Sequence, residues 1–140
     1  FLKSVVKEMR LLKRVHFIGF VDDNLMPYLY KQSIALVMPT YFGSTNIPPL
    51  DAFALEVPVI YSDLPGLRSQ VNKAALLINL KSYDSLMLAL KKLIEQPALR
   101  KKLIGEGKKT LALSNDNMRI QILEEIIQDF KMKKFTYSLK

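Results

Sequence analysis

A short polar loop between two apolar runs contains the residues best suited to ligand chemistry. The loop, Thr40 to Asn46, holds hydroxyl groups, one glycine and one amide, and it has no net charge. The apolar run Ile34 to Met38 precedes it and ends at Pro39, and a second apolar run, Val57 to Tyr61, follows. If both runs are parallel strands, the loop leaves the carboxyl end of the first one, which is where open α/β sheets bind ligands.

Two prolines begin the helix that follows this loop. Pro48 and Pro49 are tolerated in a first turn, because the amides they replace have no acceptor within the helix. The N–H groups of Ile47, Leu50 and Asp51 remain there, beside the positive end of the helix dipole. Such a helix start is suited to the oxygens of a phosphate or a sugar.

The two apolar runs need a supporting fold. Each is short and apolar throughout, as is typical of a strand that is buried on both faces of a parallel sheet. Only about a dozen residues of helix separate the loop from the second run, which predicts a β-α-β crossover. A third strand is predicted at Ala74 to Ile78, after a Pro-Gly turn at Asp63 to Gly66 and a helical turn at Leu67 to Val71.

The order and spacing of several short segments resemble a known family. The segments are Pro39-Thr40, Ile47-Pro48-Pro49-Leu50-Asp51-Ala52, Pro58-Val59-Ile60 and Ser62-Asp63-Leu64-Pro65-Gly66-Leu67-Arg68. Together they resemble the nucleotide-sugar-binding half of the group 1 retaining glycosyltransferases, which have the GT-B fold and are related to glycogen and sucrose synthases. The resemblance implies an α/β, Rossmann-like, three-layer parallel sheet followed by C-terminal helices.

The resemblance also implies roles for individual residues. In the family, an acid at the position of Gly43 contacts the donor sugar, and an acid at the position of Asp51 binds the ribose hydroxyls. Because glycine has no side chain, we expect Thr45, Asn46 and loop amides to hold the sugar instead. The implied donor-binding residues are Gly43, Ser44, Thr45, Asn46, Ile47, Leu50 and Asp51. Phe20 and Val21 are implied to form the wall around the nucleobase.

The N-terminal part of the chain predicts a helix and a strand. Phe1 to Leu12 has apolar residues at helical spacing, and Val15 to Phe20 has the composition of a strand at one edge of the sheet. The resemblance implies that the first strands of this lobe and the whole acceptor lobe lie outside the chain, so that residues 1–140 form a partial donor-binding domain. The edge strand then lacks its neighbours: non-native pairing and loose attachment are alternatives, and a fragment of a longer protein is favoured.

Several residues allow more than one interpretation. His16 is the only histidine, and a packed or edge-exposed role is favoured over a catalytic one. The run Asp22 to Asn24 is interpreted as N-capping residues of a helix over Leu25 to Gln32, in preference to a metal site. Tyr41 and Phe42 are expected either to stack on the donor or to cover the end of the sheet.

Helices are predicted from Ser82 onward. Ser82 is a candidate N-cap, Pro97 restarts the helix, and Gly105 and Gly107 are expected to loosen it. A final helix is predicted from about Asn117 to Lys133, with an apolar stripe formed by Ile120, Leu123, Ile126, Ile127 and Phe130.

Composition limits the class of protein. The 140 residues are 49% apolar and 24% charged, as in an ordinary soluble domain, and no apolar run is long enough to span a membrane. The absence of cysteine excludes disulfides and thiolate metal sites. The net charge of +8 is interpreted mainly as solvated faces and a basic tail, with attraction to anionic lipid or nucleic acid as the less favoured alternative.

The resemblance therefore predicts part of an enzyme of polysaccharide biosynthesis. It would bind a nucleotide-diphosphate sugar, without a metal ion or other cofactor, for retaining transfer to a glycan or lipid acceptor held by the missing lobe. The fragment alone is expected to be inactive. We expect a cytoplasmic protein without nucleic-acid partners, and peripheral contact at the inner face of the membrane is the less favoured addition. The alternatives are a non-catalytic nucleotide-binding or interaction module, and more weakly an electrostatic adaptor for membranes or nucleic acids.

Overall fold

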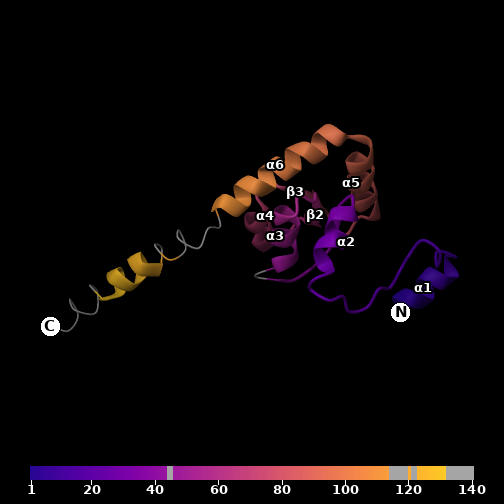
Figure 1. The fold of residues 1–140 in the computed structure, drawn as a ribbon, viewed down its shortest axis with the longest axis horizontal. Helices are drawn as coiled ribbons and strands as arrows, with labels where there is room; N and C mark the ends of the chain where they lie inside the picture. The colour runs from indigo at the N-terminus through magenta and orange to yellow at the C-terminus, as the bar shows by residue number, and fades with distance from the viewer. Residues whose placement is uncertain (44–45, 114–119, 121–122, 132–140) are drawn as a thin grey trace.

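A parallel three-stranded sheet forms the centre of the molecule. The computed structural model describes residues 1–43, 46–113, 120 and 123–131 (Figure 1). The strands are β1 (Leu36–Met38), β2 (Val59–Ser62) and β3 (Ala75–Ile78), in the spatial order β1-β2-β3. The three strands predicted after Ile34 are thus confirmed, with starts one or two residues later.

Helices connect and cover the strands. The bounds are α1 (Leu2–Glu8), α2 (Met26–Gln32), α3 (Ile47–Ala54), α4 (Pro65–Val71), α5 (Tyr83–Glu95) and α6 (Pro97–Leu113). Strand β1 leads through α3 to β2, and β2 leads through α4 to β3. The predicted Pro-Gly turn is instead the start of α4, since proline is well tolerated at the first helical position. Ser82 is the N-cap residue of α5, although its side chain makes no capping hydrogen bond.

Two apolar clusters lie on opposite faces of the sheet. Because side chains alternate along a strand, Val59 and Tyr61 of β2 join one cluster and Ile60 joins the other. The first cluster includes residues of α2, α3 and α4, and the second includes residues of α5 and α6. All four residues of β2 are buried. This arrangement confirms the predicted three-layer α/β fold.

Helix α6 remains continuous through its two glycines, so the prediction that Gly105 and Gly107 loosen it was wrong. A Cβ atom at Gly107 would lie only 2.9 Å from Cδ1 of Phe53 in α3, whereas a Cβ at Gly105 would meet nothing within 4 Å. The glycine at 107 therefore lets α6 approach α3 closely. Figure 1 shows α6 running alongside the helices that cover the sheet. Packing against α3 outweighs the poor helix propensity of glycine.

The predicted strand Val15 to Phe20 is absent, and this segment is irregular chain. The exposed fractions of Ile18 and Phe20 are 63% and 90%. A strand needs a neighbour for its backbone N–H and C=O groups, and no described strand lies beside this segment. His16 is exposed in the same segment. Helix α1 is shorter than predicted, buries no residue and lies apart from the sheet (Figure 1).

The interpretation of Asp22 to Asn24 as helix caps was also wrong. The N-cap residue of α2 is Leu25, and no side chain caps that helix. The backbone carbonyl of Asp22 instead accepts hydrogen bonds from the N–H groups of Leu25, at 2.8 Å, and Met26, at 3.2 Å. The acidic side chains before α2 are therefore not used by the helix itself.

The predicted C-terminal helix lies partly outside the described residues. Residues 123–131 are helical, and Leu123, Ile126, Ile127 and Phe130 of the predicted apolar stripe are exposed. Within the described part of the chain, no helix has the length and apolar character needed to cross a membrane.

Candidate functional site

The loop after β1 begins with a local hydrogen-bonded turn. The Thr40 hydroxyl donates to the Phe42 carbonyl at 2.6 Å and accepts from the Phe42 N–H at 3.2 Å. The turn leaves Tyr41 and Phe42 exposed, with exposed fractions of 73% and 89%. These aromatic rings therefore do not cover the end of the sheet, and stacking on a donor stays a prediction. Ser44 and Thr45 lie outside the described residues.

Gly43 makes room for Asn46. The φ angle of Gly43 is +145°, in the region that favours glycine, and a Cβ at this position would lie 2.2 Å from Oδ1 of Asn46. An acidic side chain at position 43 would thus collide with Asn46 where it stands. The Asn46 side chain occupies the space that a side chain at position 43 would need.

The Asn46 side chain does not cap α3, although Asn46 is its N-cap residue. A capping oxygen normally accepts from the second or third N–H of the helix, but Pro48 and Pro49 occupy these positions and have no N–H. Asn46 Nδ2 instead donates to the hydroxyl of Tyr61, which lies in β2.

A third residue closes this network. The Tyr61 hydroxyl donates to Oε1 of Gln70 at 3.0 Å, and Gln70 Nε2 donates to the backbone carbonyl of Asn46. Gln70 belongs to α4. The start of α3 is therefore held by side chains from β2 and from α4, which fixes the end of the polar loop.

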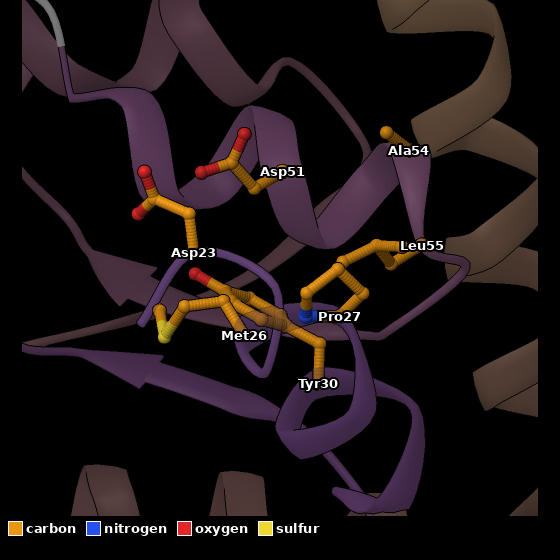
Figure 2. Close-up of a pocket in the computed structure, with 7 residues that line it drawn as sticks. All are labelled: Asp23, Met26, Pro27, Tyr30, Asp51, Ala54 and Leu55. Atoms are coloured by element: carbon orange, nitrogen blue, oxygen red, sulfur yellow. The ribbon is translucent and has the colours of Figure 1, made fainter. Parts of the chain in front are cut away.

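Asp51 faces a pocket between α2 and α3. The pocket has a volume of about 400 Å³ and is lined by Asp23, Met26, Pro27, Tyr30, Asp51, Ala54 and Leu55. Figure 2 shows the carboxylates of Asp51 and Asp23 on the same side of this pocket, with the Tyr30 ring beneath them. The volume falls within the range of small-molecule sites, roughly 300–1,000 Å³.

Tyr30 supplies a protonated hydroxyl to the pocket. Its side chain is buried, and its hydroxyl lies 3.5 Å from the carbonyl oxygen of Pro48. Burial, and secondly the negative charge of Asp51, raise the pKa of Tyr30 above its usual value of 10.0. The phenol therefore keeps its proton at neutral pH. Two carboxylates and a hydroxyl suit a ligand that carries several N–H or O–H donors.

The structure brings together some predicted site residues and separates others. Gly43, Asn46 and Ile47 lie at the start of α3, and Leu50 and Asp51 follow on the same helix. Phe20 and Val21 do not line the Asp51 pocket: Phe20 is exposed, and Val21 lines a separate apolar pocket with Ile18 and Leu25. Their role as a nucleobase wall stays a prediction.

Sequence reasoning missed Asp23, Met26 and Tyr30 as pocket residues. The helical spacing of Met26 and Tyr30, four residues apart, indicates a common face, but it does not reveal that this face meets α3. Within the described ranges, no group of three or more His, Cys, Asp or Glu side chains is placed to hold a metal ion.

The comparisons with known proteins identify the family. The fold is a parallel α/β sheet with a pocket between two of the helices that cover it, and open sheets of this kind are common in ligand-binding domains. Residues 1–110 match the model of the family described as glycosyl transferases group 1, and the chain belongs to that family.

Two curated relatives are O-antigen chain mannosyltransferases. The chain is 32% identical over 96 residues to O-antigen chain mannosyltransferase RfbU of Salmonella typhimurium, which covers 69% of this chain and 27% of the relative. It is 29% identical over 72 residues to O-antigen chain mannosyltransferase B of Escherichia coli, which covers 51% of this chain and 19% of the relative. The chain thus spans about a quarter or less of these relatives.

A solved structure confirms the predicted fold. Sucrose-phosphate synthase from Thermosynechococcus elongatus superposes with a TM-score of 0.78 at 26% identity, covering 92% of this chain and 33% of that protein. The resemblance to group 1 glycosyltransferases, stated from short segments, is confirmed over most of the chain.

Proposed function

We propose that this chain is the donor-binding part of a retaining glycosyltransferase, which transfers a sugar from a nucleotide diphosphate to a glycan or lipid acceptor. The observation that carries the proposal is the position of Asp51, which faces a pocket on the helix that follows the polar loop. Family membership and the names of the relatives support transfer of a hexose within polysaccharide biosynthesis.

Asp51 is proposed to bind the ribose. Its carboxylate offers two acceptor oxygens, which match the two neighbouring hydroxyls of a ribose. The exposed position of Asp51 on the pocket rim leaves these oxygens accessible. An aspartate is one methylene shorter than a glutamate, so the ribose would sit closer to the α3 backbone.

The diphosphate is assigned to the start of α3. The proposed donors are the N–H groups of Ile47 and the preceding loop, together with the positive end of the helix dipole. Because Pro48 and Pro49 remove two N–H groups, the loop supplies a larger share of the donors than in an ordinary helix start. These fixed dipoles would stabilise the charge that develops on the leaving diphosphate, and no metal ion is assigned to this step.

The donor sugar is assigned to the segment Gly43 to Asn46, including Thr45. The Asn46 side chain is already oriented by Tyr61, and an oriented amide holds a hydroxyl without further ordering. We further propose a cytoplasmic protein, with peripheral contact at the inner face of the membrane as a less favoured addition. The net charge of +8 supports contact with anionic lipids there.

The test uses the intact protein with a panel of nucleotide-diphosphate sugars, and it measures hydrolysis or transfer. We expect turnover with one donor and a loss of about tenfold or more in kcat/KM for Asp51→Ala, since hydrogen bonds to a charged group are worth about 1.5–3 kcal/mol. The control is Asp84→Ala, because Asp84 is exposed on α5, away from the pocket. Undiminished turnover in Asp51→Ala would contradict the assignment.

A second candidate function is a non-catalytic nucleotide-binding module. Gly43 favours it, because this glycine stands where the family has a sugar-binding acid. Nucleotide binding that depends on Asp51, without turnover of any donor, would support this alternative over the enzyme.

A further inference from the structure

Asp23 is a second carboxylate on the pocket that contains Asp51. It comes from the turn before α2, whereas Asp51 comes from α3, so the two acids approach the pocket from different elements. The turn is fixed by the Asp22 carbonyl, which accepts from the N–H groups of both Leu25 and Met26. Figure 2 shows both carboxylates pointing toward the same side of the pocket. No ion pair is found for either acid among the described residues.

The rest of the pocket is largely apolar. Met26, Pro27, Ala54 and Leu55 contribute carbon-rich surface beside the Tyr30 ring. A flat aromatic ligand can pack on such surface, while polar groups at its edge meet the carboxylates. The pocket therefore combines the two features that binding of a nucleobase requires.

The bases differ in what they offer to a carboxylate. Guanine presents N1–H and the N2 amino group side by side, and these two donors match the two oxygens of one carboxylate. Uracil presents a single N–H between two carbonyl oxygens. Cytosine and adenine each place an amino group next to an acceptor nitrogen. Only guanine thus forms a bidentate contact without placing an acceptor against the negative charge.

We propose that Asp23 accepts hydrogen bonds from the base of the donor nucleotide, and that it makes this pocket select a guanine nucleotide. The inference rests on the proposed function, in which Asp51 binds the ribose. The base then lies over the apolar surface of the pocket with its donor edge toward Asp23, and not against the wall predicted from Phe20 and Val21. A uracil nucleotide in the same position would turn a carbonyl oxygen toward the carboxylate.

The test is equilibrium binding of GDP, UDP, ADP and IDP to the intact protein. IDP differs from GDP only in lacking the N2 amino group. We expect GDP to bind about tenfold or more tightly than UDP and IDP, which corresponds to one lost hydrogen bond to a charged acceptor. In Asp23→Asn the difference between GDP and IDP should fall to about twofold or less, because the amide offers one acceptor oxygen in place of two.

Two variants control this experiment. Asp22→Asn removes the neighbouring charge without touching the pocket lining, and it should leave the preference for GDP unchanged. Asp51→Asn should weaken all four nucleotides by a similar factor, since every one carries the same ribose. Circular dichroism spectra of each variant verify that the chain is folded.

The outcomes separate the inference from the proposed function. If no nucleotide binds, the proposed function itself fails, and this inference fails with it. If nucleotides bind through Asp51 but show no preference for GDP, or if Asp23→Asn keeps the full difference between GDP and IDP, base selection by Asp23 is overturned while the proposed function stands. A preference for GDP that disappears on adding EDTA would also overturn it, because Asp23 would then act through a metal ion.

Discussion

Strand β2 and the segment at residues 15–20 are both short apolar runs, but only one of them is a strand. Strand β2 pairs with β1 on one side and with β3 on the other, and its residues are buried. The segment at residues 15–20 has no pairing partner among the described strands, and Ile18 and Phe20 are exposed. An apolar run indicates that a segment can form a strand, but the strand forms only where adjacent strands are available to pair with its backbone.

Shortening one isoleucine in each region tests this difference between β2 and residues 15–20. Ile60 of β2 is fully buried, and Ile18 is 63% exposed. Ile60→Ala should lower the free energy of unfolding by about 2–5 kcal/mol through lost burial and a cavity. Ile18→Ala should change it by no more than about 0.5 kcal/mol. Urea denaturation of both variants, followed by circular dichroism, gives the two values, and similar losses would contradict the distinction.

The two glycines of α6 have different surroundings, since Gly107 faces the Phe53 ring and Gly105 faces open space. Gly107→Ala should destabilise the fold by about 1–3 kcal/mol, because the new Cβ would press on the Phe53 ring. Gly105→Ala meets open space and should stabilise it by about 0.5–1 kcal/mol through better helix propensity. Thermal denaturation of both variants checks the opposite signs. A gain in stability for Gly107→Ala would mean that α6 does not approach α3 as described.

The hydroxyl of Tyr61, a buried residue of β2, connects Asn46 and Gln70 at the site. Tyr61→Phe should cost about 1–3 kcal/mol, because it leaves Asn46 and Gln70 without their shared partner. The control is Tyr28→Phe, since the Tyr28 side chain is 65% exposed. Urea denaturation should separate the two variants clearly, and equal stability would show that the network does not support the loop.

The smallest expected effect concerns Tyr30 at alkaline pH. Burial and the charge of Asp51 raise the pKa of Tyr30 in the folded state above its usual value of 10.0. The unfolded chain therefore loses this proton first, so stability is full below pH 10 and falls as the pH rises through the folded pKa. Tyr30→Phe should reduce this alkaline loss. Stability measured between pH 8 and pH 11 checks the slope, and an unchanged slope would contradict the assignment.

Much of the fold could be predicted from local sequence. The strands after Ile34 were predictable because each is a continuous apolar run that ends at a turn, and the start of α3 because prolines favour a first turn. The sequence also placed Asp51 on that helix beside the polar loop. The fold class followed from these elements and from the resemblance, and the structure confirms it.

The failures share a physical cause, which is contact between residues distant in the chain. The continuity of α6 depends on the fit of Gly107 against Phe53, which helix propensity alone does not include. Residues 15–20 do not form the predicted strand because no strand of the described part of the chain lies beside them to pair with them. Asp23 was interpreted as a local cap, whereas its place in the pocket arises from the packing of α2 beside α3.

The hydrogen bonds of Gln70 couple the start of α3 to α4. Gln70 holds the Asn46 carbonyl and the Tyr61 hydroxyl at once, so opening of the start of α3 breaks hydrogen bonds that connect it to α4. Loop and helix should then open as one cooperative unit, with a single free energy of local opening. A ligand held by the loop should slow amide hydrogen exchange in α4, although α4 does not line the Asp51 pocket. Occupancy of the site could therefore be followed from a helix that does not line this pocket.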